Sequence, residues 1–158
     1  MTKYDVYGIG NALVDKEFEV EEDFFEKHNI EKGLMTLVDH DHQDFLLAQL
    51  METYGLKTRA GGGSAANSLY ALSQFGGKAF YSCRVANDET GDFFLNSLGQ
   101  HNIETNLKGQ RIDGTSGRCL VMITPDAERT MQTYLGVSDA ISISEMDFDA
   151  AKQAKIIY

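Results

Sequence analysis

The chain is organised around the segment Ala60–Ser68, which reads Ala-Gly-Gly-Gly-Ser-Ala-Ala-Asn-Ser. A β-prone run, Leu56–Arg59, precedes it, and a helical pattern of apolar residues follows it until Gly76-Gly77. The three glycines therefore stand where a strand passes into a helix. Glycine permits positive φ and lets a ligand approach the main chain. The first turn of a helix adds unpaired N–H groups with partial positive charge.

Ser64 and Asn67 lie one helical turn apart in this segment and add a hydroxyl and an amide to it. Together with Gly62 and Gly63, they predict a pocket wall for a hydroxyl-rich or anionic small molecule. The alternative is a tight turn in which Ser64 is an ordinary N-cap. Glycine is common at strand–helix junctions, so these residues alone leave both interpretations open.

The length, charge and cysteine content of the chain limit the kinds of protein it can be. Its 158 residues suit one domain, and a chain of this length buries about 70% of its unfolded surface. The net charge of −10 argues against binding to nucleic acid or to an anionic membrane surface. Cys83 and Cys119 lack CxxC spacing and are expected to be buried thiols in a reducing compartment. No signal peptide or spanning apolar run is evident, so we expect a cytoplasmic protein.

The run Val6–Gly10 predicts a buried first strand, which Asn11 and Asp15 follow. The third glycine of a dinucleotide-binding fingerprint would fall at Leu13, so that motif is incomplete. In open α/β sheets, ligands bind beyond the carboxyl ends of the strands. An amide and a carboxylate placed there can bind adjacent sugar hydroxyls. The alternative for Asp15 is a solvent-facing loop acid.

The middle of the chain alternates between strand and helix patterns. Strands are expected at Leu34–Val38 and Lys78–Val85, and helices are expected between Asp39 and Gly55 and from Phe93 to about Gly99. This alternation is typical of an α/β fold with parallel core strands. His40 and His42 do not share a helix face, so we predict solvated histidines and no metal site.

The last third of the chain is rich in strand patterns. Thr115–Thr124 and Arg129–Leu135 predict a hairpin, with Pro125 in its turn. Ser144 is expected to cap a last helix that reaches about Ala154. Lys155–Tyr158 then opens an apolar strand that leaves a sheet edge free, so we expect the chain to be part of a longer protein. Arg129 opens the return strand of the hairpin, where a lone arginine is usually a surface charge.

Four segments in this order resemble the ribokinase (pfkB) family and, within it, the adenosine-kinase-like branch. They are Gly8–Asn11 with Asp15, Gly62–Ser68, Val85–Gly91, and Thr115–Gly117 leading to Glu128–Thr130. The resemblance implies a doubly wound, mainly parallel α/β domain with a small β-sheet lid. Residues 1–158 would form the N-terminal part of that domain, with lid strands within about 13–20, 34–38 and 56–60.

The resemblance also implies an ATP-dependent kinase that phosphorylates a primary hydroxyl of a nucleoside or a sugar. Asn11 and Asp15 would bind the ribose hydroxyls, and Arg129 would point toward the substrate and the transferred phosphoryl group. Met131 and Leu135 would give apolar contacts suited to a purine. The sugar site would be completed by Gly62, Gly63, Ser64 and Asn67.

Two motifs of the family are missing from this sequence. They are Asp-Thr-x-Gly-Ala-Gly-Asp, which carries the anion hole and the catalytic base, and Asn-x-x-Glu, which is linked to Mg²⁺ and phosphate. Both normally lie downstream of the position that corresponds to Tyr158. We therefore expect the ATP- and Mg²⁺-binding motifs beyond residue 158, and we expect the isolated chain to be inactive.

The substrate and the partners remain open at this level. A nucleoside such as adenosine, inosine or guanosine is the first choice, and a sugar or sugar phosphate is the alternative. A non-catalytic nucleoside- or sugar-binding module, or a dinucleotide-binding domain with Asp39 as its acidic residue, is the competing class. Some relatives form a homodimer through the lid, and others are monomers.

Overall fold

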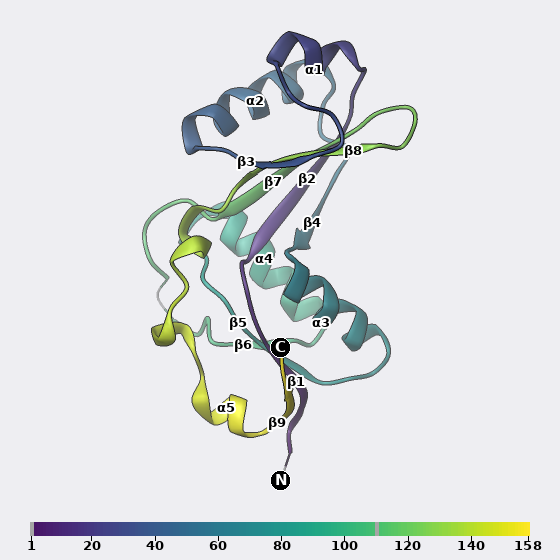
Figure 1. Ribbon diagram of the computed structural model, residues 1–158. Helices are drawn as coiled ribbons and strands as arrows, with labels where there is room; N and C mark the ends of the chain where they lie inside the picture. Colours follow the sequence, from purple (N-terminus) through teal and green to yellow (C-terminus); the bar gives the residue numbers. More distant parts are fainter. Residues whose placement is uncertain (1, 110) are drawn as a thin grey trace. The chain divides into compact units, whose positions relative to one another are not determined.

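The computed structural model describes residues 2–109 and 111–158, and its chain divides into two compact units (Figure 1). The first unit contains Met1–Val14, Gly61–Gly117 and Leu135–Tyr158. The second unit contains Asp15–Ala60 and Arg118–Tyr134. Each unit has its own sheet and its own core, so each is described separately.

The sheet of the first unit has the strand order β6-β5-β1-β9. Its strands are β1 (Tyr4–Ile9), β5 (Ala79–Ser82), β6 (Glu104–Thr105) and β9 (Ala154–Ile157). The pairings of β1 with β5, β1 with β9 and β5 with β6 are all parallel. The chain first builds outward from β1 to β6 and then returns to place β9 on the other side of β1. This is a doubly wound parallel arrangement, as expected from the sequence.

Helices cover both faces of this sheet, because side chains alternate between the two faces of a strand. On one face, Leu69 of α3 (Ser64–Gln74) and Phe94 of α4 (Glu89–Gln100) pack in one cluster with Tyr81 of β5. On the other face, Ala150 of α5 (Phe148–Lys152) packs with an aromatic group in which Tyr7 and Phe80 stack, their ring centroids 5.4 Å apart.

The second unit has a sheet in the order β3-β8-β7-β2-β4. Its strands are β2 (Leu13–Glu19), β3 (Met35–Leu37), β4 (Thr58–Gly62), β7 (Gly117–Ile123) and β8 (Arg129–Tyr134). Strands β7 and β8 form the antiparallel hairpin expected from the sequence, and the N–H of Ala127 donates to the carbonyl of Thr124 in its turn, at 2.8 Å. Strand β3 pairs with β8 in parallel.

Two helices, α1 (Asp23–His28) and α2 (His40–Thr53), lie on one side of the sheet of the second unit (Figure 1). Leu46 and Leu50 of α2 are fully buried and share a core cluster with Phe18 of β2 and with Leu120 and Met122 of β7. No helix in the described residues has the length and apolar character that crossing a membrane requires.

The C-terminal segment differs from the sequence expectation. Ser144 does not cap a helix that reaches Ala154. Instead, Ser142 caps a single 3₁₀ turn, η2 (Ile143–Glu145), and Asp147 caps α5 by accepting from the N–H of Ala150 at 2.8 Å. Another 3₁₀ turn, η1 (Gly136–Ala140), follows shortly after β8. Two closely spaced caps divide this segment into separate turns, because each stabilises its own helix start.

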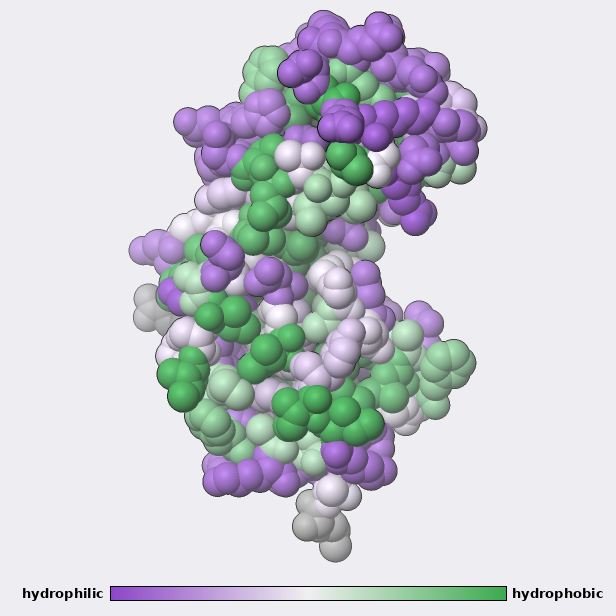
Figure 2. Space-filling view, in the orientation of Figure 1, coloured by the Kyte–Doolittle hydropathy of each residue, from purple (hydrophilic) through white to green (hydrophobic). Residues whose placement is uncertain are grey.

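Two further details concern exposed apolar side chains of the first unit. Phe75 lies just past the end of α3 and is 90% exposed. Strand β9 lies at the sheet edge, as expected for Lys155–Tyr158, and Figure 2 shows hydrophobic surface over it. Ile156, Ile157 and Tyr158 are each more than half exposed.

Candidate functional site

The glycine segment forms the start of α3. Gly63 is the N-cap of this helix, with φ 98° and ψ 140°, and no side chain caps the helix. Ser64 is the first helical residue, so its alternative interpretation as the N-cap is wrong. A backbone at this φ strongly favours glycine. Without a capping side chain, the N–H groups of the first helical turn are not satisfied from within the helix.

The loop after β1 packs directly against this helix start. A β-carbon on Gly63 would lie 2.3 Å from the carbonyl oxygen of Asn11, and a β-carbon on Gly10 would lie 3.0 Å from the Cβ of Ala65. The first distance excludes a β-carbon unless the main chain moves, and the second would require a small shift of Ala65. The first unit therefore brings Asn11, Gly62, Gly63 and Ser64 into one small region, and Asn67 lies one helical turn further on.

This region lies at the carboxyl end of β1, where the winding of the sheet reverses between β1 and β9. In doubly wound sheets, ligands bind at such switch points. The hydroxyl of Ser68 donates to the Oη of Tyr158, which follows β9, at 3.4 Å. The end of β9 therefore lies beside α3, as a switch-point site requires.

Tyr81 takes part in this region, although the sequence interpretation gave it no role. Its hydroxyl donates to the carbonyl oxygen of Asn11 at 3.2 Å, and its side chain is fully buried. The interpretation of Lys78–Val85 as a core strand predicts a buried residue at this position. It does not predict a hydrogen bond to a main-chain carbonyl that lies 70 positions earlier in the chain.

The remaining site residues belong to the second unit, except Leu135. Asp15 lies in β2, three residues before Phe18, and so faces away from α1 and α2. Burial raises the pKa of Asp15 to about 6, and the nearby carboxylate of Glu17 adds to this rise. Asp15 is therefore a strand residue and not a loop acid.

Met131 shares a sheet face with residues of the two neighbouring strands. It pairs with Val121 of β7 and with Met35 of β3. The side chains of Met35 and Leu37 are 55% and 59% exposed. This face, which lies opposite α1 and α2, therefore presents apolar side chains together with the carboxylate of Asp15. Leu135 belongs to the first unit, where it caps η1.

Arg129 is exposed at the start of β8, beside the hairpin turn. The turn itself is held firmly. The ammonium of Lys32 contacts carboxylates of Glu22 and Asp126, each at 2.6 Å, and the N–H of Gly33 donates to the Oγ1 of Thr130 at 2.9 Å. These contacts fix the main chain on both sides of Arg129.

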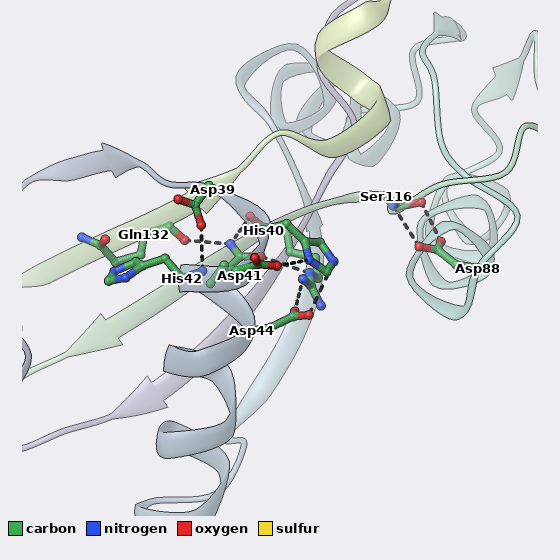
Figure 3. Close-up of polar contacts among 10 residues, drawn as sticks. Asp39, His40, Asp41, His42, Asp44, Asp88, Ser116 and Gln132 are labelled. Carbon is green, nitrogen blue, oxygen red and sulfur yellow. Dashed lines mark hydrogen bonds and ion pairs between the residues drawn. The ribbon is translucent and has the colours of Figure 1, made fainter.

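The motif segments Val85–Gly91 and Thr115–Gly117 meet through Asp88 (Figure 3). Asp88 caps α4 by accepting from the N–H of Gly91 at 2.8 Å, and it accepts from both the N–H and the hydroxyl of Ser116 at 2.8 and 2.7 Å. Burial alone would raise the pKa of Asp88, but the hydrogen bonds from Ser116 and Gly91 outweigh it and lower the pKa. This contact is structural and joins two segments of the first unit.

A second cluster of polar side chains lies at the start of α2 (Figure 3). Asp39 caps this helix, and Gln43 donates to the carbonyls of Arg118 and Gln132 at 2.8 and 3.1 Å. These contacts attach α2 to the sheet of the second unit. His40 contacts Asp44 at 3.4 Å. Across residues 2–109 and 111–158, no group of three or more His, Cys, Asp or Glu side chains could hold a metal ion.

Comparison with known proteins places the chain in a family. Residues 36–158 match the profile of the pfkB family of carbohydrate kinases. The chain belongs to this family. The ribokinase-like α/β fold expected from the sequence agrees with the solved structures that it matches.

Three of the most similar proteins are kinases. A guanosine-inosine kinase of Escherichia coli strain K12 is 27% identical over 128 residues, which are 79% of this chain and 30% of that protein. The crystal structure of an adenosine kinase from Sinorhizobium meliloti matches with a TM-score of 0.88 and 32% identity, over 99% of this chain and 47% of that one. The crystal structure of a probable sugar kinase from Rhizobium etli CFN 42 matches with a TM-score of 0.90 and 30% identity, over 100% of this chain and 47% of that one. The pfkB chain described here thus spans about half the length of its relatives or less.

Proposed function

We propose that this chain supplies the substrate-binding part of an ATP-dependent kinase that phosphorylates a primary hydroxyl of a nucleoside. The observation that carries the proposal is the contact between Asn11 and Gly63 at the switch point of the sheet. It places the main chain of Asn11 beside an uncapped helix start in a chain of the pfkB family. The relatives named adenosine kinase and guanosine-inosine kinase favour a nucleoside.

The chemistry of these residues suits ribose. The amide of Asn11 can donate and accept, and the carboxylate of Asp15 accepts from hydroxyl groups. The amide of Asn67 and the N–H groups of the first turn of α3 add donors near Asn11. We assign Asn11, Gly62, Gly63, Ser64, Asn67 and Asp15 to the binding of the sugar hydroxyls.

Transfer requires the primary hydroxyl oxygen of the substrate to attack the γ-phosphorus of ATP. A new O–P bond forms, the bond from the γ-phosphorus to the β,γ-bridging oxygen breaks, ADP leaves, and the hydroxyl proton passes to a base. Positioning and charge neutralisation dominate such reactions. We assign Arg129 to the transferred phosphoryl group. We assign the base and the metal to the two family motifs that are missing from this sequence and are expected downstream of residue 158.

The sheet of the second unit fits the lid that the family resemblance implies. Its free face carries Asp15 and Met131, with the exposed apolar side chains of Met35 and Leu37 beside them. We propose that this face contacts the substrate, with Met131 against the base, and that Leu135 adds a further apolar contact. A lid that excludes water protects the phosphoryl group from hydrolysis.

A sugar or sugar phosphate is the second candidate substrate. The match to the probable sugar kinase from Rhizobium etli CFN 42 is as extensive as the match to the adenosine kinase. An apolar wall such as that around Met131 discriminates only modestly between similar ligands.

The test is a kinase assay on the protein expressed from its complete reading frame. Adenosine, inosine, guanosine, ribose and fructose are each offered with ATP and Mg²⁺, and ADP release is measured. We expect turnover with at least one nucleoside and a loss of about 100-fold or more in kcat/KM for Asp15→Ala and Asn11→Ala. Asn96→Ala, which lies on the exposed face of α4, is the matched control and should match the wild type. Turnover of a sugar with no response to any nucleoside would select the second candidate, and binding of neither class would refute both.

A further inference from the structure

The loop after β1 is held by a buried hydroxyl from the neighbouring strand. Tyr81 lies on β5 within the apolar cluster formed with α3 and α4, and its ring lies 6.3 Å from that of Phe94. Its hydroxyl reaches the edge of this cluster and donates to the carbonyl oxygen of Asn11 at 3.2 Å. Burial raises the pKa of Tyr81, so the hydroxyl keeps its proton at any physiological pH.

The same carbonyl also lies against Gly63. A β-carbon on Gly63 would lie 2.3 Å from the oxygen of Asn11, and one on Gly10 would lie 3.1 Å from the Oη of Tyr81. The phenol, the peptide of Asn11 and the start of α3 therefore form one continuous packed group, in which the two glycines leave the required space.

We propose that Tyr81 is a positioning residue of the substrate site, whose hydroxyl fixes the peptide of Asn11 and thereby aims the Asn11 side chain at the substrate. The inference rests on the proposed function, because it assumes that Asn11 binds the substrate. Tyr81 itself acts only through Asn11. Removing the hydroxyl takes away one of the contacts that hold the Asn11 carbonyl in place, and small displacements of a binding group reduce affinity and rate.

The chain contains a matched control for this change. Tyr7 of β1 is also fully buried, and its hydroxyl lies 2.6 Å from the Oγ of Ser82 and accepts from the N–H of Asp147 at 3.0 Å. It belongs to the cluster on the opposite face of the same sheet. Tyr7→Phe therefore removes a buried phenol hydroxyl from the same sheet without touching Asn11.

The experiment compares Tyr81→Phe and Tyr7→Phe in the protein from the complete reading frame. Adenosine affinity is measured by calorimetry, KM and kcat are measured by assay, and folding is checked by circular dichroism at the assay temperature. We expect Tyr81→Phe to raise the Kd and KM for adenosine about three- to tenfold, which corresponds to the loss of one oriented hydrogen bond. The KM for ATP should not change. Tyr7→Phe should lower the melting temperature and leave the adenosine Kd unchanged.

A double-mutant cycle separates positioning from a merely structural role. If Tyr81 acts through Asn11, Tyr81→Phe should have no further effect on adenosine affinity in an Asn11→Ala background. Two results would overturn the role of Tyr81 but leave the proposed function standing. One is an adenosine Kd that Tyr81→Phe does not change. The other is a loss of adenosine affinity from Tyr81→Phe that is as large in the Asn11→Ala background as in the wild type. A wild type that binds neither nucleosides nor sugars would instead remove the proposed function and this inference together.

Discussion

The main chain of Gly63 lies against the carbonyl oxygen of Asn11 so closely that a β-carbon at position 63 would be 2.3 Å from that oxygen. A backbone atom cannot move aside as a flexible side chain can. The glycine is therefore required twice, once for its φ of 98° and once for the space it leaves. The contact joins the loop after β1 to the start of α3.

Gly63→Ala should therefore destabilise the protein by about 2–4 kcal/mol. It should also abolish measurable substrate binding, because the loop and the helix start must separate. Chemical denaturation and calorimetry measure the two effects. Gly76→Ala is the matched control, since Gly76 also has a positive φ, of 83°, but a β-carbon added there would meet no described atom within 4 Å. It should cost about 1–2 kcal/mol and leave binding unchanged.

Asp15 should make stability depend on pH in an unusual direction. Its pKa is raised to about 6 by burial and by Glu17, above the ordinary value of an unfolded chain. Between about pH 4 and pH 6 the folded state binds more protons than the unfolded state, so stability falls as pH rises through this window. Asp15→Asn should remove this dependence and stabilise the protein at pH 7.5 by on the order of 1 kcal/mol.

Asp15→Asn should also weaken substrate binding, although it raises stability. The reason is that the amide replaces one accepting oxygen of the carboxylate with a donating NH₂ group. Denaturation series at pH 4.5 and 7.5 with wild type and Asp15→Asn measure the first effect. An equal response of both proteins to pH would show that the carboxyl group titrates normally.

The contribution of Asp88 to stability should decrease as the pH falls, which is the usual direction for a carboxylate. Its pKa is lowered by hydrogen bonds from Ser116 and Gly91, which outweigh burial. The stabilisation is complete above the unfolded pKa and is lost as pH falls through the folded pKa. We expect Asp88→Asn to be less stable than wild type at pH 6 and to lose less stability on acidification below pH 4. Parallel curves for the two proteins would contradict this account.

Lys32 should set the pKa of Asp126. The ammonium of Lys32, followed by the hydroxyl of Thr124, holds the pKa of this carboxyl group well below its ordinary value. In Lys32→Met, we expect the Asp126 pKa, followed by NMR titration, to move back toward the ordinary value. Stability should change little, because exposed ion pairs contribute little. Lys57→Met removes an exposed pair with Glu19 and should leave the titration of Asp126 unaltered.

Residues 1–158 alone should bind a nucleoside weakly and show no ATP-dependent turnover, because the sequence lacks the two family motifs to which the resemblance assigns the catalytic base and the link to Mg²⁺. A coupled ADP assay at high protein concentration checks this. Turnover by these residues alone would mean that the base lies among them.

Local signals in the sequence predicted the parts of the fold that depend on local chemistry. The glycines before α3, the cap at Asp39 and the Pro125 turn each determine their own conformation. The division near Ser142 and Asp147 was missed because two valid caps compete within a few residues. The role of Tyr81 was missed because its hydrogen bond joins residues far apart in the chain.

The first unit brings part of the predicted site together, and the roles of these residues stay a prediction. Gly62, Gly63 and Ser64 lie together with Asn11 because the sheet places the end of β1 beside the start of α3. Met131 and Leu135, although close in sequence, belong to different units. Their common role in binding a base stays a prediction.

The order of strands in the second unit has a consequence for how the protein is made on the ribosome. Strand β3 pairs with β8, which lies roughly 90 residues later in the chain, a delay of roughly 5–20 s of synthesis. During that time the main-chain N–H and C=O groups with which β3 pairs to β8 have no partner strand. Nascent chains should therefore engage chaperones between the emergence of β3 and that of β8 and be released once the hairpin has closed the sheet.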